Sequence, residues 1–122
     1  MNIDKKVLAQ FVGTTKWHRF NGLSSNSLLT DGAKYVADEG SAYWLMDIIV
    51  SAQLVPKVKV EPFQVWTLII NEDQSDNVRA TDGNENLIYT QAIKWIDFNL
   101  DNMKLYAVKE EDYLIIMLPS EY

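Results

Sequence analysis

The stretch AYWLMDIIVSAQL, residues 42–54, decides the fold expected for this chain. Drawn at about 100° per residue, a helix over this stretch is apolar around most of its circumference. The exception is one narrow stripe that carries Trp44, Asp47 and Ser51. Because a helix that is apolar nearly all round is a buried helix, this one must touch a sheet on one side. Its other side must meet the remaining helices or a partner subunit.

Two further helices are expected before this stretch. Asp4 can cap a short amphipathic helix over residues 4–12. Either Thr30 or Asp31 can cap a second helix that runs to about Glu39. The helical part of the chain therefore occupies its first half.

The connections in this half carry turn and strand signals. Residues 14–20 are rich in β-formers and predict a short strand, and residues 21–27 have the composition of a loop. Residues 28–29 predict a second short strand, which would close a loose hairpin. Ser41 follows a glycine and can cap the helix of residues 42–54.

Strand patterns dominate the second half. Residues 57–61 alternate before a proline and predict an edge strand, and residues 63–71 predict a central strand with apolar side chains on both faces. Further strands are expected at residues 78–81, 86–95, 103–108 and 113–118, with turns at residues 82–84 and 109–112. The predicted fold class is α+β, in a single domain over residues 1–122. N-terminal helices would pack on a C-terminal antiparallel meander of about four to five strands.

Amino-acid composition excludes several classes of function. The chain has 122 residues, of which 48% are hydrophobic and 23% charged, so it can bury a core. The absence of cysteine excludes disulfides, zinc–thiolate sites and thiol nucleophiles. The net charge is −6, and the basic clusters Lys57/Lys59 and Lys16/His18/Arg19 are thin. Because phosphate contacts need clustered positive charge, these clusters argue against nucleic acid as a partner.

Location follows from the same composition. Residues 1–6 lack the continuous apolar stretch of a secretory signal. The longest apolar run, residues 42–50, is interrupted by Asp47 and falls far short of the roughly 20 residues needed to span a bilayer. We therefore expect a cytoplasmic protein without a membrane partner.

The search for catalytic motifs is negative. The chain has one histidine, His18, whereas a histidine-based metal site needs several ligands. The five glycines are dispersed, so no glycine-rich phosphate loop exists, and no G-x-S-x-G nucleophile elbow is present. We expect no catalytic residue, no metal and no cofactor.

Asp47 is the acidic residue that the helical pattern places among apolar side chains. A buried carboxylate needs a partner, such as Lys34, Arg19 or a tyrosine hydroxyl. It could anchor the helix or contact a ligand, and Trp44 on the same stripe could line a pocket that Tyr35 joins. For His18, a partly exposed strand histidine is the simplest interpretation, and a ligand contact is the alternative. The candidate ligand- or partner-binding residues are Trp17, His18, Arg19, Asp31, Tyr35, Trp44, Asp47 and Ser51.

Several runs of sequence resemble a family of small uncharacterised bacterial and phage proteins. The matching runs, in order, are LAQFVGT at 8–14, LTDGAKYVA at 29–37, AYWLMD at 42–47, FQVWTL at 63–68 and DGN at 82–84. The chain departs from that pattern at residues 21–27, where the family has a shorter, proline-containing link. The resemblance implies no activity and no residue roles. It implies a setting of bacteria, phages and mobile elements, which favours proteins that act by binding, including inhibitors of a host system.

Three functional hypotheses follow. The first is a non-catalytic binding protein that forms a homo-oligomer through the apolar helix of residues 42–54 and meets a protein partner. The second is a small-molecule binder for a nucleotide-like signal, which would use Trp44 and Tyr35 for stacking and a basic residue for phosphate. The third is a small enzyme that uses Asp47 and His18 as an acid–base pair.

Overall fold

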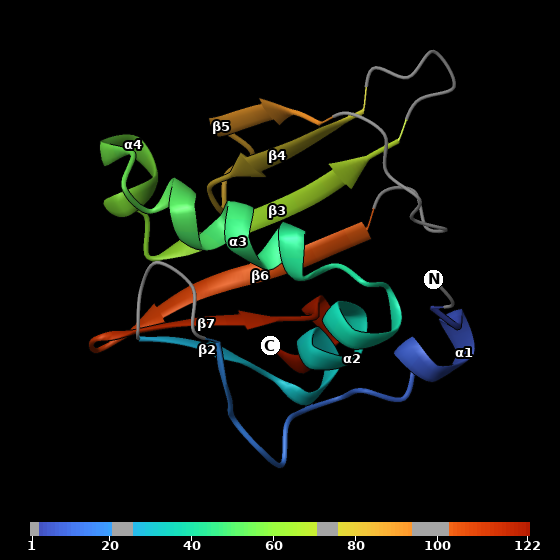
Figure 1. The fold of residues 1–122 in the computed structure, drawn as a ribbon. Helices are drawn as coiled ribbons and strands as arrows, with labels where there is room; N and C mark the ends of the chain where they lie inside the picture. Colours follow the sequence, from blue (N-terminus) through green and yellow to red (C-terminus); the bar gives the residue numbers. More distant parts are fainter. Residues whose placement is uncertain (1–2, 21–25, 71–75, 94–102) are drawn as a thin grey trace.

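Among the described residues, seven strands form one sheet in the order β1-β2-β7-β6-β3-β4-β5 (Figure 1). The computed structural model describes residues 3–20, 26–70, 76–93 and 103–122. The strands are β1 His18–Phe20, β2 Ser27–Leu29, β3 Phe63–Ile69, β4 Asn77–Thr81, β5 Leu87–Ala92, β6 Met103–Glu110 and β7 Tyr113–Met117. Neighbouring strands are antiparallel except β2 and β7, which are parallel.

The fold is α+β, as predicted, but the sheet is larger than predicted and mixed. Five C-terminal strands, β3 to β7, pair antiparallel, as predicted, but β1 and β2 from the N-terminal half extend the sheet, and β2 joins β7 in parallel. The predicted loose hairpin is confirmed, since His18 pairs with Leu29. The predicted strand over residues 14–20 is confined to its last three residues. The addition of β2 beside β7 pairs Leu28 with Ile115, which is a contact between distant segments that no local pattern specifies.

Four α-helices and one 3-10 turn lie within the described residues. They are α1 Lys5–Leu8, α2 Asp31–Glu39, α3 Tyr43–Ala52, α4 Pro56–Lys59 and η1 Pro119–Glu121. Asp4 and Thr30 cap α1 and α2, and the Thr30 hydroxyl accepts a 3.2 Å hydrogen bond from the Ala33 amide. Figure 1 shows α2 and α3 on one face of the sheet, whereas α4 packs against β5. None of the described helices is long and apolar enough to cross a membrane.

Two predictions about the helical segments were wrong: the edge strand at residues 57–61 and the helix cap at Ser41. Residues 57–61 do not form an edge strand, because Pro56 occupies the first turn of α4 and suits a helix start. The alternation of valine and lysine there buries Val58 but leaves Val60 74% exposed. Ser41 does not cap α3: its φ of 48° turns the chain between α2 and α3, and Ala42 stands at the cap without a side-chain hydrogen bond.

The core lies between α3 and the sheet. Leu45, Met46 and Ile49 of α3 are buried in one cluster with Trp66 and Leu68 of β3. Burial is confined to one side of α3, because Tyr43 and Asp47 are exposed. The prediction of a helix buried all round was therefore wrong.

The opposite side of the sheet carries no described α-helix. Strand side chains alternate between faces, and β3 alternates between buried and half-buried residues. Buried Gln64, Trp66 and Leu68 face the helices, so Phe63 and Val65 point the other way. We call this second surface the open face. Its central apolar side chains, placed by register, are Leu28, Phe63, Val65, Tyr106, Val108, Ile115 and Met117.

Candidate functional site

The predicted site around Asp47 does not form. Asp47 is exposed on α3 and has no hydrogen bond or ion pair with any described residue. Trp44 and Ser51 on the same stripe are half-buried. Lys34, one predicted partner, instead holds Asp38 on its own helix at 2.6 Å, and Arg19 is exposed on β1. The core-facing residues of α3 lie on the side opposite Asp47, so this carboxylate never needed a buried partner.

His18 and Asp31, both predicted candidates, do come together. Asp31 is the first residue of α2, and its Oδ1 lies 2.8 Å from His18 Nε2. Its Oδ2 accepts hydrogen bonds from the Thr15 amide and the Thr15 hydroxyl, both at 2.9 Å. The Asp31 amide in turn donates to the Thr14 hydroxyl oxygen at 2.9 Å. This network fixes residues 14–18 against the start of α2.

The environment of Asp31 favours its charged form. The Thr15 amide, the His18 ring and the Thr15 hydroxyl, in that order, hold the pKa of the Asp31 carboxyl well below its usual range. The start of a helix also favours a negative charge. Among the described residues, His18 Nε2 bonds to the Asp31 carboxylate. The pair joins β1 to the start of α2.

Replacement of Asp31 by asparagine is expected to destabilise the protein in a pH-dependent manner. The folded-state pKa of Asp31 lies below that of an unfolded aspartate, about 3.9. Its stabilisation is therefore present above that pH and is lost as the pH falls toward the folded-state pKa. Urea unfolding of both proteins at several pH values measures this. Wild type should have the larger free energy of unfolding at neutral pH, and the difference from the variant should shrink below about pH 4. A difference that does not change with pH would contradict the lowered pKa of Asp31.

The remaining predicted aromatic residues lie apart from Asp47. Trp17 precedes β1 and is 55% exposed. The Tyr35 hydroxyl accepts a 3.1 Å hydrogen bond from the Asp4 amide, and its ring centroid lies 5.6 Å from that of Phe11. Tyr35 thus holds the α1 segment, and the predicted stacking platform with Trp44 does not assemble.

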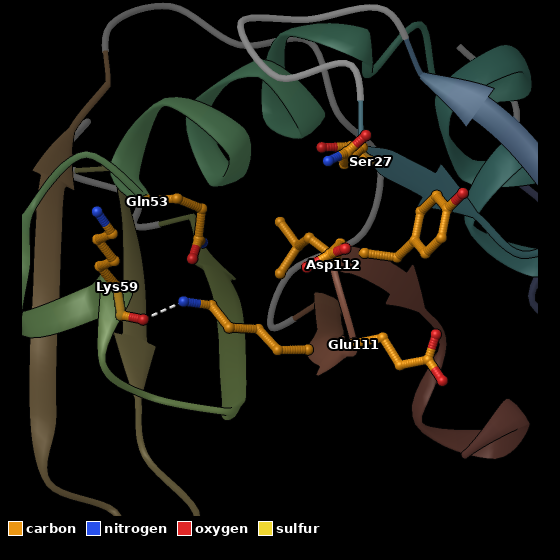
Figure 2. Close-up of a pocket in the computed structure, with 9 residues that line it drawn as sticks. Ser27, Gln53, Lys59, Glu111 and Asp112 are labelled. Atoms are coloured by element: carbon orange, nitrogen blue, oxygen red, sulfur yellow. Dashed lines mark hydrogen bonds between the residues drawn. The ribbon is translucent and has the colours of Figure 1, made fainter.

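A cleft that the sequence did not reveal lies between α3, α4 and the β6–β7 hairpin (Figure 2). Its volume is about 320 Å³. The lining residues are Asn26, Ser27, Gln53, Lys59, Lys109, Glu111, Asp112, Tyr113 and Leu114. None of the predicted candidate residues lines it. Local patterns could not find it, because its walls come from distant segments that the β2–β7 and β3–β6 pairings bring together.

The open face is the second notable surface. The rings of Phe63, Tyr106 and Tyr122 form a cluster with centroid distances of 4.9, 5.2 and 5.7 Å. Tyr122 is 75% exposed. A broad hollow of about 520 Å³ lies beside β7, lined by Trp17, Leu28, Glu110, Glu111, Tyr113 and Ile115. Exposed aromatic side chains around a hollow are typical of surfaces that bind other proteins.

Within the described ranges, no three histidine, aspartate or glutamate side chains come together as a metal site. The chain matches the model of a family of unknown function (DUF6876) over residues 2–122. It belongs to that family. The match confirms the resemblance to an uncharacterised family and extends it over nearly the whole chain.

A solved structure supports the fold of this DUF6876 member. The chain is similar to a protein of unknown function from Enterococcus faecalis, with a TM-score of 0.60 and 14% sequence identity. The alignment covers 80% of this chain and 90% of the other. At this identity the likeness extends to the fold alone. No curated protein matches the chain.

Proposed function

We propose that this protein is a non-catalytic interaction protein that works as a homodimer joined through the open face. The observation that carries the proposal is the order of side chains along β6, the middle strand of the sheet. On the open face, β6 presents Lys104, Tyr106, Val108 and Glu110 in sequence. This order is positive, apolar, apolar, negative, so it complements itself when the strand is reversed.

Apolar side chains surround β6 on the open face. Val65 and Phe63 flank it on β3, and Met117 and Ile115 flank it on β7. Two sheets that pack face to face lie about 10 Å apart with interdigitated side chains. Phe63, Val65, Tyr106 and Val108 are half-buried, whereas Ile115 and Met117 are already only 5% and 8% exposed. A second copy would remove the remaining exposed apolar area of β3 and β6 from water, and such burial is the main favourable term in protein association.

Charge selects one orientation of the second copy. Consider a twofold axis that lies in the plane between the two sheets and runs across the strands. It reverses β6, so that Lys104 faces Glu110 of the second copy and Tyr106 faces Val108. A twofold axis parallel to the strands would place Lys104 beside its own equivalent, which is unfavourable. Arg79 adds positive charge at the same end of the open face as Lys104, because both residues pair with Thr67. Paired surfaces of opposite charge fix register and orientation.

Replacement of Val108 by glutamate should yield a monomer. The substitution introduces one charge from each copy beside the twofold axis, and burial of an unpaired charge is unfavourable. We expect the dissociation constant to rise by at least about tenfold, equivalent to about 1.4 kcal/mol. Light scattering and sedimentation as a function of concentration measure this, and circular dichroism checks that the variant stays folded. A monomeric wild type at working concentration would refute the dimer.

An exchange of charges tests the orientation. Lys104→Glu and Glu110→Lys should each weaken the dimer, because each creates two like-charged contacts. The double variant should recover wild-type association, since it restores both pairs. Glu39→Lys, an exposed charge reversal on α2, is the matched control and should have no effect. If the double variant is as weak as the single ones, the strand-reversed arrangement is wrong.

The earlier prediction of self-association through α3 gives a competing outcome. Asp47→Lys changes the charge of the exposed side of α3 and leaves the open face intact. If this variant dissociates the dimer while Lys104→Glu does not, the interface lies on α3 and the proposal fails. A phage origin and inhibition of a host system stay predictions from the family resemblance.

A further inference from the structure

We infer that the cleft between α3, α4 and the β6–β7 hairpin binds a small molecule through an oxyanion, either a carboxylate or a phosphate group. We call it the Lys109 cleft. It lies on the helix side of the sheet, so this inference is independent of the proposed dimer. Its volume of about 320 Å³ is at the lower end of the range for ligand pockets.

The first observation is the hydroxyl of Ser27. Ser27 is 0% exposed and lines the cleft, and its Oγ has no hydrogen-bond partner among the described residues. Buried polar atoms normally have a partner, so an unpaired one indicates that another molecule supplies it. Ser27 pairs with Leu114 on β7, and Figure 2 shows its side chain at the top of the cleft. A ligand oxygen in the cleft would supply the missing hydrogen-bond partner of the Ser27 hydroxyl.

The second observation is the ammonium group of Lys109. Lys109 pairs with Leu114 from the other side, so it points to the same face as Ser27 across β7. Its Nζ donates to the backbone carbonyl of Lys59 (Figure 2). A lysine ammonium has three donors, so two of them are available to a ligand. Among the described residues, no carboxylate lies within ion-pair distance of Lys109.

The charges around Lys109 favour an anion. Burial and the nearby positive charge of Lys59 lower the pKa of Lys109. An anionic group beside Lys109 would offset both effects. The acidic residues Glu111 and Asp112 also line the cleft, but neither forms an ion pair with a described lysine. In Figure 2, the Glu111 side chain points away from the cleft.

The spacing defines the class of ligand. Ser27 and Lys109 are separated by one strand, which places their backbones about 10 Å apart. Leu114 of β7 lies between them on the same face, and the Lys109 side chain extends toward Lys59 on α4. A ligand that contacts both Ser27 and Lys109 must therefore bridge this span across Leu114, which a small molecule can do. An oxyanion at Lys109 with a further oxygen near Ser27 describes a small organic acid or a phosphate monoester.

Titration with inorganic phosphate and, separately, with malonate tests the inference. The readout is the amide NMR spectrum of the full chain at constant ionic strength, with sodium chloride as the blank. One of the two anions should cause saturable shifts at Ser27, Lys59 and Lys109 at millimolar concentration. Which anion does so identifies the phosphate or carboxylate source.

Variants separate binding from folding. Lys109→Met should abolish the saturable shifts, whereas the control Lys5→Met, at an exposed lysine of α1 that lines neither the cleft nor the open face, should leave them unchanged. Ser27→Ala should weaken binding about fivefold to tenfold, which corresponds to a lost hydrogen bond. It should not lower the melting temperature, since the hydroxyl has no internal partner. The inference fails if neither anion gives saturable shifts, or if Lys109→Met binds as well as wild type.

Discussion

Replacement of Gln64 by leucine is expected to lower the free energy of unfolding by about 3–5 kcal/mol. Gln64 is 0% exposed on β3, and its amide joins four other groups. A leucine of similar size would fill the space but accept and donate nothing. The loss is a large share of the roughly 5–15 kcal/mol that stabilises a typical domain.

The contacts of Gln64 explain this magnitude. The two hydrogens of its Nε2 are shared among three acceptors: the carbonyl oxygens of Val58 at 3.1 Å and Glu61 at 3.0 Å, and Gln53 Oε1 at 3.0 Å. Its Oε1 accepts from Gln53 Nε2 at 2.9 Å and from Trp66 Nε1 at 3.0 Å. Through these bonds, the Gln64 side chain joins the end of α3, the turn of α4 and strand β3. Removal of a partner from a buried polar group costs about 1–3 kcal/mol each time.

A double-mutant cycle with Trp66→Phe isolates one contact of this network. Phenylalanine lacks the indole donor, so in the Trp66→Phe background Gln64→Leu should cost about 1 kcal/mol less. Urea unfolding of the four proteins gives the coupling. Gln10→Leu, the same change at an exposed site on the α1 segment, is the control and should lie within about 0.5 kcal/mol of wild type. If Gln64→Leu also falls within that range, the network does not stabilise the fold.

Local signals in the sequence predicted the elements that depend on local physics. The Thr30 cap placed α2 correctly, because capping acts within one turn. The Asp82 turn is similar: its side chain accepts from the amides of Asn84 and Asn86 and joins β4 to β5. The apolar run of residues 63–71 predicted β3, and the acidic turn at residues 109–112 predicted the hairpin of β6 and β7.

Features that depend on contacts between distant segments could not be predicted from local signals. The addition of β2 to β7 depends on a pairing between Leu29 and Ile116, and three apolar or small residues cannot specify it locally. Asp47 was misplaced because helical periodicity gives relative angles but not which side meets the sheet. The Lys109 cleft was missed for the same reason, since Lys109 was interpreted as part of a solvated turn although β6 extends to Glu110.

The run Thr30-Asp31-Gly32 within the family resemblance now has a physical explanation. Together the three residues fix two other segments to the start of α2. Thr30 caps the helix and donates to Glu121 Oε1 at 2.6 Å, while Asp31 holds the segment before β1. The Gly32 amide donates to Glu121 Oε2 at 3.0 Å. These three residues therefore join the N-terminal segment, α2 and η1, which supports a structural role for the motif.

Gly32→Ala is accordingly expected to lower the free energy of unfolding by about 2 kcal/mol. No described glycine has a positive φ, so the requirement here is for space rather than for backbone freedom. A Cβ at Gly32 would meet Glu121 Oε1 at 2.4 Å and Leu118 Cδ1 at 2.5 Å. Glu121 would have to move, and the loss of one of its hydrogen bonds costs about 1.5–3 kcal/mol. The helix preference of alanine over glycine offsets at most about 1 kcal/mol of this loss.

Two comparisons show whether Glu121 mediates the effect. In a Glu121→Ala background, Gly32→Ala should cost much less than in wild type, because the displaced carboxylate is already absent and only Leu118 must adjust. Gly13→Ala is the matched control: a Cβ there meets nothing within 4 Å, so this variant should be as stable as wild type. Urea unfolding with two-state analysis gives all four values. Equal costs of Gly32→Ala in both backgrounds would show that the carboxylate does not act through Gly32, and the assignment of the motif to η1 would fail.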